Sequence, residues 1–567
     1  MRILSPIRDE GGFRNYMESS NYWTRFSRSQ LSRRRFLVGG ATIGAGLATA
    51  GLIGCSSDDS PTTSGTPAGG GQPRYGGNLT IHVSGDAPHM DLHQSNSIFQ
   101  AASGAGLAYS RLFRKKIGSG GLPNAFIPEG DVVEKVENPS PATYIFHLRK
   151  GIKYHNIAPV NGRELVANDV IQSFNRQISE KLNGENLADV ASMTATDNYT
   201  LRFELKAPSA DFLLQLTDGR TPIIPHESWE LKGDVKAGPI IGTGAWIFDN
   251  FVQNQVTSLK RNPEYFRTGQ PYADTLTFQR IIDPNTAQQA LRTGSLVLLT
   301  QINKQIASQL SGFVLQEARL SGALGGNKIW IHNDVGNGAK VQVRQAISKA
   351  MNRQAIIQTI EFGSGFVTAG VGVPDSSWFL PDDEFNRLLA YDVPGAKTLM
   401  QQAGVPSWSP QFFAGGRNFP NIIPAAELVT AQLKDAGINS TIVPIDNIQL
   451  LNNAWGAGDW DLGYGGQQPQ ISPTSNLEKF YKTGGSQNGY KINDTELDRM
   501  IVQQKELVGN PDERKRVFQQ IQRRVIDQAV LIPVYNASGG VLLSPKLKNF
   551  VQDNNENSRF EIAWLEA

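Results

Sequence analysis

The sequence predicts a mixed α/β protein built from two or three domains. Short segments in which apolar and polar residues alternate indicate strands, and longer segments with apolar residues every three or four positions indicate helices. From residue 394 to 445 the expected order is helix, short strand, helix, strand, which is typical of parallel strands joined by helices. About 490 residues follow Tyr75, and a chain of that length is too long to fold around a single hydrophobic core.

Strands are expected mainly in the N-terminal half. Residues 78–84, 143–148 and 198–205 alternate as half-buried strands do. In the C-terminal half we expect shorter strands over residues 411–413 and 440–445, and a strand that crosses between domains over residues 532–535.

Helices are marked by their first and last residues. Residues 169–182 form an expected helix with Asn168 as its N-cap, and residues 343–361 are expected to form one continuous helix. Asn510 and Pro511 open another helix. Two further helices, over residues 394–403 and 424–436, are each ended by a glycine.

The N-terminal segment has the pattern of an export signal. Residues 1–35 hold eight arginines and three acidic residues, a net charge of +5, and Arg33, Arg34 and Arg35 directly precede an apolar run over residues 36–53. Cys55 is the only cysteine, and it follows Leu52-Ile53-Gly54 at the end of this run. We therefore expect residues 1–55 to be a twin-arginine lipoprotein signal, with Cys55 lipidated. An uncleaved N-terminal anchor is the alternative, since 18 apolar residues are long enough to span a bilayer.

Residues 56–74 are rich in Ser, Thr, Gly and Pro, so we expect a disordered tether. Because the whole chain has a net charge of +2 and the signal carries +5, the remainder has a net charge of −3. This near-neutral balance gives no electrostatic reason to expect nucleic-acid binding. No apolar run after Cys55 is long enough to cross a membrane.

Several short motifs follow one another along the chain, at Gly242-Thr243-Gly244-Ala245-Trp246, at Arg261–Phe266 and in five other segments. They resemble the motifs of the extracellular solute-binding proteins of family 5, which serve peptide, nickel and oligopeptide ABC transporters. The motif Gly242-Thr243-Gly244-Ala245-Trp246 is similar to the family's GTGPY, and Arg261–Phe266 is similar to its rNpdYw block. Each motif alone is weak, but together they extend over nearly all of residues 75–567. The other similar segments are residues 76–79, 144–155, 161–170, 343–353 and 396–404.

The resemblance implies a periplasmic-binding-protein-like clamshell of type II, with two α/β lobes and an additional inserted α+β domain. The following ranges are carried over from the family. Lobe I is expected at residues 75–100, 222–318 and 535–567, the inserted domain at 101–221, and lobe II at 319–534.

The implied function is capture of a peptide, an oligosaccharide or another polar solute by hinge closure, with delivery to an ABC permease and ATPase complex. We expect a monomer without cofactor or catalytic activity, anchored by lipid at the outer face of the cytoplasmic membrane. Two alternatives stay open. One is a chaperone or sensor on the same scaffold, and the other is an exported hydrolase.

The segment 459–467 resembles the family stretch that lines the ligand cleft. Peptide-binding members have an Asp there that pairs with the peptide ammonium, and Gln467 occupies the matching position. Because an amide carries no charge, this difference favours a polar, uncharged ligand or a peptide that is recognised in another way. The expected ligand-binding residues are Tyr464, Gln467, Gln468, Trp378 and Trp460. The aromatic residues among them suit ring-shaped or apolar groups of a ligand. Trp455 lies nearby in the sequence.

Other residue clusters are expected to be structural. His89 and His93 flank Asp91, but we expect packing or solvated histidines there and no metal site. Asp382, Asp383 and Glu384 could suggest a glycosidase pair, yet adjacent acids next to a proline are usually a solvated patch. No motif of a zinc hydrolase, serine hydrolase or phosphate-binding loop is present in the sequence.

Overall fold

The computed structural model describes residues 72–567, apart from gaps at 96, 117–126, 181–183, 301, 319–324, 375, 416–420, 446–459, 468–469, 471 and 552–558. Arg33, Arg34 and Cys55 of the expected export signal therefore lie outside the described residues, as do Gln468 and Trp455. Within the described ranges, no helix is both long and apolar enough to cross a membrane.

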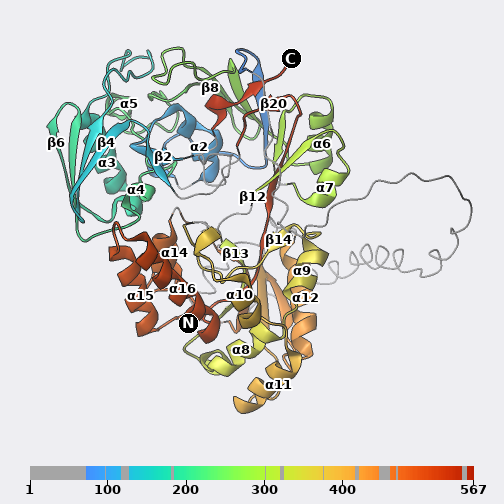
Figure 1. Ribbon diagram of the computed structural model, residues 1–567. Coiled ribbons are helices and arrows are strands. Elements are labelled where there is room, and N and C mark those ends of the chain that lie inside the picture. Colours follow the sequence, from blue (N-terminus) through green and yellow to red (C-terminus); the bar gives the residue numbers. More distant parts are fainter. Residues whose placement is uncertain are drawn as a thin grey trace, which may run out of the picture. The chain divides into compact units, whose positions relative to one another are not determined.

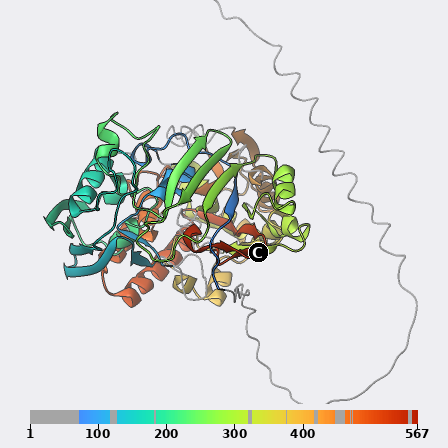
Figure 2. The same ribbon diagram turned by 90° about the horizontal axis from the view of Figure 1, so that it is seen from above.

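The largest sheet has seven strands and draws on both ends of the described chain (Figure 1). Strand β1 lies in its middle and pairs in parallel with β10 and β11, whereas the other neighbours pair antiparallel. Figure 2 shows the green strands of this sheet beside the blue strand β1. The order is β12 (Val314–Ala318), β19 (Gly539–Leu543), β11 (Leu298–Thr300), β1 (Asn78–Val83), β10 (Thr275–Arg280), β9 (Val256–Arg261) and β8 (Trp246–Val252).

A second, four-stranded antiparallel sheet is packed against helix α3 (Ala167–Glu180). Val170 and Phe174 of α3 share one core with Phe146 and Phe203 of the sheet, as the apolar spacing of these segments predicts. The order is β4 (Val133–Ser140), β5 (Thr143–Leu148), β7 (Thr200–Leu205) and β6 (Val190–Asp197).

The expected N-cap of α3 is wrong. The helix begins at Ala167, so Asn168 lies inside its first turn. Instead, the Asp169 carboxylate accepts a hydrogen bond from the backbone N–H of Val166 at 2.9 Å, and the carboxylate also binds Arg163. An acidic side chain in the first turn stabilises a helix because the exposed N–H groups there carry partial positive charge.

The third sheet has six strands and is partly parallel, as the helix–strand order after residue 394 predicts. Strand β15 pairs in parallel with β16 and β17, and the remaining neighbours are antiparallel. The order is β14 (Gly365–Phe366), β18 (Ile532–Ala537), β13 (Gly325–Ile331), β17 (Leu462–Gln467), β15 (Gln411–Gly415) and β16 (Thr441–Ile445).

Helices pack against both faces of the six-stranded sheet, because β13 directs apolar side chains to both. Ile329 and Ile331 join one core, and Trp330 joins the other. The first core includes α8 (Val341–Lys349), α9 (Arg353–Ile360), α11 (Val393–Gln402) and α12 (Ile422–Lys434). The second includes α14 (Pro473–Phe480), α15 (Thr495–Glu506) and α16 (Pro511–Gln528).

The expectation of one helix over residues 343–361 is wrong, because α8 and α9 are separate. The chain leaves the helix after Lys349, and the Asn352 side chain caps α9 by accepting a hydrogen bond from the Ala355 N–H at 3.0 Å. Ala350, Met351 and Ile356 are all buried in the same core. The apolar pattern therefore continues across a break in the backbone.

One extended segment joins the six-stranded sheet to the seven-stranded sheet. Strand β18 lies in the former, and β19, which follows after Ser538, lies in the latter. Figure 1 shows this red segment passing from beside β14 to beside β12. The expected crossing strand at residues 532–535 falls inside β18, whereas the expected domain limits stay a prediction.

The other short strands and α-helices of the described residues are β2 (Phe113–Lys115), β3 (Pro128–Gly130), β20 (Leu547–Lys548), β21 (Trp564–Leu565), α2 (Ile98–Ser103), α4 (Phe212–Gln215), α5 (Glu227–Glu230), α6 (Pro284–Arg292), α7 (Lys304–Ser308) and α10 (Asp382–Leu388).

Candidate ligand-binding site

Strands β13 and β17 are antiparallel neighbours whose side chains divide between the two faces of the six-stranded sheet. Tyr464 and Ile329 face the core that contains α8 and α12. Trp330 faces the other side, and its ring lies against Gly465 so closely that an added Cβ would meet it at 2.7 Å. Lys328 and Gln467 project to this second side as well, where their side chains meet.

The Lys328 ammonium is buried, with 1% of the residue exposed. Its Nζ donates to the Gln467 side-chain oxygen at 2.8 Å and to the Gly326 carbonyl oxygen at 3.2 Å. Among the described residues, neither an aspartate nor a glutamate forms an ion pair with it. Burial lowers the pKa of Lys328 to about 7, because a charged ammonium loses its hydration in the interior.

Neighbouring polar groups hold this pair in place. The Gln467 side-chain nitrogen donates to the Tyr490 hydroxyl at 3.4 Å, so the amide oxygen faces the lysine. Gly370 has a φ of +82°, and an added Cβ there would lie 3.0 Å from Lys328 Cε. The Tyr481 hydroxyl donates to the Gly370 carbonyl at 2.6 Å and so fixes this close approach.

The crossing strand β18 completes the surroundings. The Asn536 side chain donates to the Thr368 hydroxyl at 3.0 Å, and Gly326 lies directly against Asn536. We use the name Lys328 cluster for this set of polar residues: Lys328, Gln467, Tyr490, Tyr481, Thr368 and Asn536.

The structure separates Tyr464 from the other expected binding residues. Tyr464 is fully buried in the core on the opposite face, with its ring centroid 6.2 Å from that of Phe412. Burial raises the pKa of its hydroxyl, which therefore stays neutral. Its position in the strand is that of a core residue.

Trp378 and Trp460 lie on the same side of the sheet as Gln467. Both belong to the apolar cluster that includes Trp330, Tyr481 and Tyr490. The Trp460 ring packs edge-on against His332 at 4.3 Å between centroids, and Trp378 packs against Phe518 at 5.4 Å. Both tryptophans are therefore buried in the core between this side of the sheet and α14, α15 and α16.

Lys328 was not among the residues expected from the sequence. A signal was present, since Lys328 lies two residues before Trp330 and so faces the same side of β13. It stands between Asn327 and Ile329 in a strand with apolar residues on both faces. A lysine in such a strand is unusual, because lysine is rarely fully buried unless it is paired. The lateral contact with Gln467 joins residues 139 positions apart, which no local pattern indicates.

The cluster around Asp91 is a buried ion pair. Arg176 donates two hydrogen bonds to the Asp91 carboxylate, at 2.6 and 3.0 Å, and a third to His93 Nδ1 at 2.9 Å. Burial, followed by the nearby Arg176 charge, lowers the pKa of His93 to about 3. Within the part of the chain that the structure describes, no group of His, Cys, Asp and Glu is arranged to hold a metal ion.

The acidic run at residues 382–384 lies in the first turn of α10, where acidic side chains favour a helix. Glu384 binds Arg523 through two hydrogen bonds, at 2.7 and 2.9 Å. This pairing gives Glu384 a structural role.

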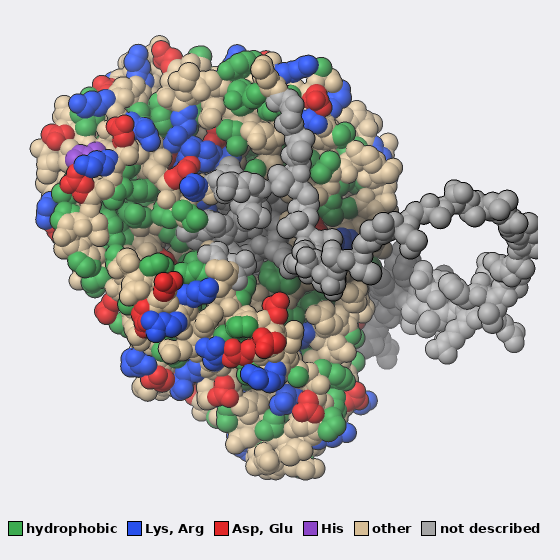
Figure 3. All heavy atoms as spheres, in the orientation of Figure 1, with side chains coloured by type: hydrophobic (Ala, Val, Ile, Leu, Met, Phe, Trp, Pro, Cys, Tyr) green, Lys and Arg blue, Asp and Glu red, His purple; other side chains and the backbone are tan. Residues whose placement is uncertain are grey.

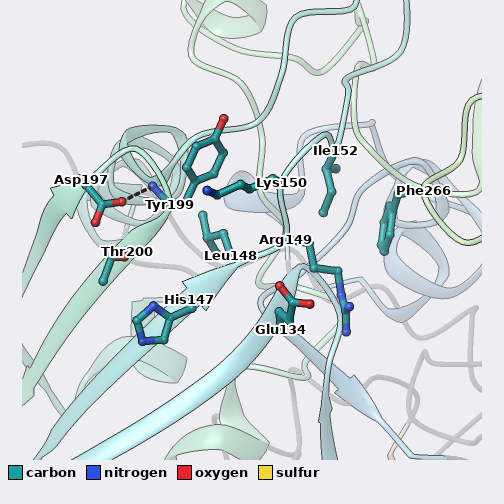
Figure 4. A pocket seen from close by; sticks show the side chains of 10 residues that line it. All are labelled: Glu134, His147, Leu148, Arg149, Lys150, Ile152, Asp197, Tyr199, Thr200 and Phe266. Atoms are coloured by element: carbon teal, nitrogen blue, oxygen red, sulfur yellow. Dashed lines mark hydrogen bonds between the residues drawn. The ribbon is translucent and has the colours of Figure 1, made fainter.

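A hollow of about 750 Å³ lies beside β5 and the turn that follows it (Figure 4). Its wall includes Lys150, whose amine lies 5.3 Å from the centroid of the Tyr199 ring, and Asp197, whose carboxylate accepts from the Tyr199 N–H at 2.7 Å. Charged side chains of both signs line this hollow. None of the expected binding residues is among its lining residues.

A buried ion pair connects the region of the four-stranded sheet to the helices beside the Lys328 cluster. Arg514 of α16 donates to the Asp211 carboxylate at 2.7 Å, and the Thr474 N–H donates to the same carboxylate at 2.9 Å. Burial alone would raise the pKa of Asp211, but the Arg514 charge and the hydrogen bonds from Thr474 and Arg514 together outweigh burial and hold that pKa below its usual value. Next to it, Lys505 binds both Asp189 and Glu478.

Residues 128–488 match the profile of the bacterial extracellular solute-binding proteins, family 5, middle region. The chain belongs to this family. The resemblance noted in the sequence is thereby confirmed.

Relatives of similar length carry names of binding proteins. Heme-binding protein A of Haemophilus influenzae is 25% identical over 480 residues, which cover 78% of this chain and 84% of the relative. A dipeptide-binding protein of Escherichia coli is 25% identical over 488 residues, which cover 81% and 89%. These named relatives are binding proteins rather than enzymes.

Solved structures show the same fold. The ABC transporter-associated periplasmic binding protein DppA of Helicobacter pylori, in complex with the peptide STSA, matches with a TM-score of 0.71 and 23% identity, over 87% of this chain and 99% of that chain. HbpA2 of Haemophilus parasuis matches with a TM-score of 0.74 and 20% identity, over 87% and 100%. The expected two-lobe, type II α/β fold is confirmed.

Proposed function

We propose that this chain is an extracytoplasmic receptor that captures a solute between two lobes and delivers it to an ABC importer. The observation that carries the proposal is the family match over residues 128–488, a range that includes the four-stranded sheet and most strands of the other two. The relatives' names give peptides and heme as their ligands. For this chain we propose a small polar solute or an oligopeptide.

Capture by hinge closure follows from the connections between the sheets. Segments such as β18–β19 run from one sheet to another without a helix between them. Ligands bind preferentially between domains, and closure is favoured only as far as the ligand binds the closed form more tightly than the open form. A permease and ATPase complex would then recognise the closed receptor.

The binding site proposed here lies around Gln467, on the same side of the six-stranded sheet as Trp378 and Trp460. Replacement of Gln467 by Ala removes one hydrogen-bonding group, so we expect the solute affinity to fall by roughly fivefold. Tyr464 lies in the opposite core, and Gln468 lies outside the described residues, so their expected ligand contacts stay proposals.

The location follows from the N-terminal sequence. We propose export by the twin-arginine route through Arg33 and Arg34, and lipid anchoring through Cys55 at the outer face of the cytoplasmic membrane. A Cys55→Ser variant of the full chain should be released from washed membranes after export. Retention of this variant in the membrane pellet would instead indicate an uncleaved helical anchor.

The function itself is tested by thermal unfolding in the presence of small molecules. A solute receptor should show a transition midpoint that rises with the concentration of the small molecules of yeast extract, because ligand binding stabilises the folded state. The extract should be recovered chemically unchanged. Consumption of an extract component by the purified protein would contradict the proposal and favour a hydrolase.

A further inference from the structure

We propose that the captured solute carries an acidic group, a carboxylate or a phosphate, that forms an ion pair with Lys328. This inference rests on the proposed receptor function and adds the chemical class of the ligand. It starts from a buried ammonium whose partners in the described structure are only two neutral oxygens, those of Gln467 and Gly326.

Several other cations in the described part of the chain, fully or partly buried, have fuller sets of partners. Arg176 and Arg514 each bind an aspartate, and Lys505 binds two carboxylates. Arg353 has no carboxylate, but it donates four hydrogen bonds to carbonyl and hydroxyl oxygens. The ammonium of Lys328 has three hydrogens and two acceptors, so one donor is available for a further partner.

The position of Lys328 fits a ligand contact. Its neighbour Asn327 pairs with Tyr535 of β18, and Gly326 abuts Asn536. Three residues after Asn536 the chain enters β19 in the seven-stranded sheet. The ammonium therefore lies where the chain crosses from one sheet to the other, and two-lobed proteins bind their ligands beside such crossings.

The surroundings hold the ammonium in one place. Gly370 lies against the lysine stem, where a larger residue would displace it, and Tyr481 fixes Gly370 through its carbonyl. Gln467 is oriented by Tyr490, and its neutral oxygen leaves the lysine charge uncompensated. A glutamate at this position would neutralise Lys328 from within the protein. The amide keeps the charge available for an acidic ligand.

An ion pair with a ligand removes the cost of the isolated buried charge. A buried charge is stable only when it is paired and hydrogen-bonded, so an anionic solute gains an interaction that a neutral analogue lacks. Carboxylates of peptides or sugar acids and phosphate esters all supply such oxygens. Chemical treatment of the ligand distinguishes a carboxylate from a phosphate.

The probe is the small-molecule part of yeast extract, separated by anion exchange into an acidic fraction and an unbound fraction. The thermal midpoints of the wild type, Lys328→Met and Lys260→Met are followed as each fraction is added. Lys260 is a surface lysine on β9 and serves as the matched control. The acidic fraction should stabilise the wild type and Lys260→Met alike, whereas Lys328→Met should need at least about tenfold more of it for the same shift.

A second variant keeps the test decisive if Lys328→Met folds poorly. Gln467→Glu retains the lysine and supplies an internal carboxylate, so it should also lose most of the response to the acidic fraction. Methyl esterification of the fraction should abolish the response if the group is a carboxylate, and phosphatase treatment should abolish it if the group is a phosphate.

The two proposals fail in different ways. If the unbound fraction stabilises the wild type and Lys328→Met equally and the acidic fraction does not, the receptor function stands and the acidic ligand is excluded. If neither fraction shifts the wild-type midpoint, the receptor function itself is contradicted.

Discussion

The ionisation of Lys328 has a measurable consequence for stability. Its pKa is lowered to about 7 from an ordinary value of 10.5, so between these pH values the unfolded chain binds more protons than the folded protein. The free energy of unfolding should therefore rise with pH above 7, by on the order of 1 kcal/mol per pH unit, and should be unaffected by this group below pH 7. The facing hydroxyls of Tyr481 and Tyr490 stay neutral because burial raises their pKa values.

Urea denaturation of the solute-free protein at pH 7, 8 and 9 measures this effect against Lys328→Met. The variant should be the more stable protein at pH 7, and its advantage should shrink as the pH rises. A stability difference between the two proteins that stays constant with pH would show that burial does not lower the pKa of Lys328.

Gln467 provides the complementary prediction. Gln467→Glu places a carboxylate oxygen at the position that now lies 2.8 Å from Lys328 Nζ, which should raise the lysine pKa. The pH-dependent gain in stability above pH 7 should then be lost in this variant. A wild-type-like pH profile in Gln467→Glu would contradict the direct contact between the two side chains.

The break between α8 and α9 is an element-scale feature that depends on Asn352. Its side chain is the N-cap of α9, so Asn352→Ala should reduce the free energy of unfolding by about 1 kcal/mol. Gln354→Ala, at an exposed position of the same helix, is the matched control and should change stability little. Equal effects of the two substitutions would show that the cap contributes nothing.

The sequence allowed some elements to be predicted better than others. Residues 143–148 were predicted as a strand with the bounds that β5 has, since alternation is a local signal. The expected helix over 343–361 was wrong because Ile347 of α8 and Ile356 of α9 pack in one core on either side of the break. The apolar pattern therefore does not indicate where the backbone leaves the helix.

The same distinction applies to the candidate site. Gln467, Trp378 and Trp460 were named through family resemblance, and they lie on one side of the six-stranded sheet. Lys328 was missed because its burial depends on Gly370, Tyr481 and Gln467, which come from distant parts of the chain. Tyr464 was grouped with the site by its place in the sequence, but strand alternation directs it into the opposite core.

At the scale of the whole molecule, the protein has a near-neutral net charge and a buried ion pair that joins two of its regions. Figure 3 shows acidic and basic side chains interspersed on the face in view, without one dominant sign. The pair between Asp211 and Arg514 joins the region of the four-stranded sheet to α16, and both side chains are buried. In a receptor that closes around its ligand, such a contact stabilises the arrangement seen here.

Removal of one partner should loosen this contact. Asp211→Asn leaves Arg514 buried without its carboxylate, which typically costs about 3 kcal/mol or more. Hydrogen exchange should accelerate at Thr474, whose N–H donates to Asp211, and at Ala210, whose N–H donates to the Lys505 carbonyl. Glu496→Gln, which affects an exposed pair with Arg499, is the control. Unchanged exchange in Asp211→Asn would show that the pair does not hold these parts together.

The most direct test is a crystal structure of the protein saturated with the solute purified from the stabilising acidic fraction. We expect the solute between the two lobes, with a carboxylate or phosphate oxygen within hydrogen-bonding distance of Lys328 Nζ. A solute bound elsewhere, or one bound there whose acidic group points away from Lys328, would contradict the account.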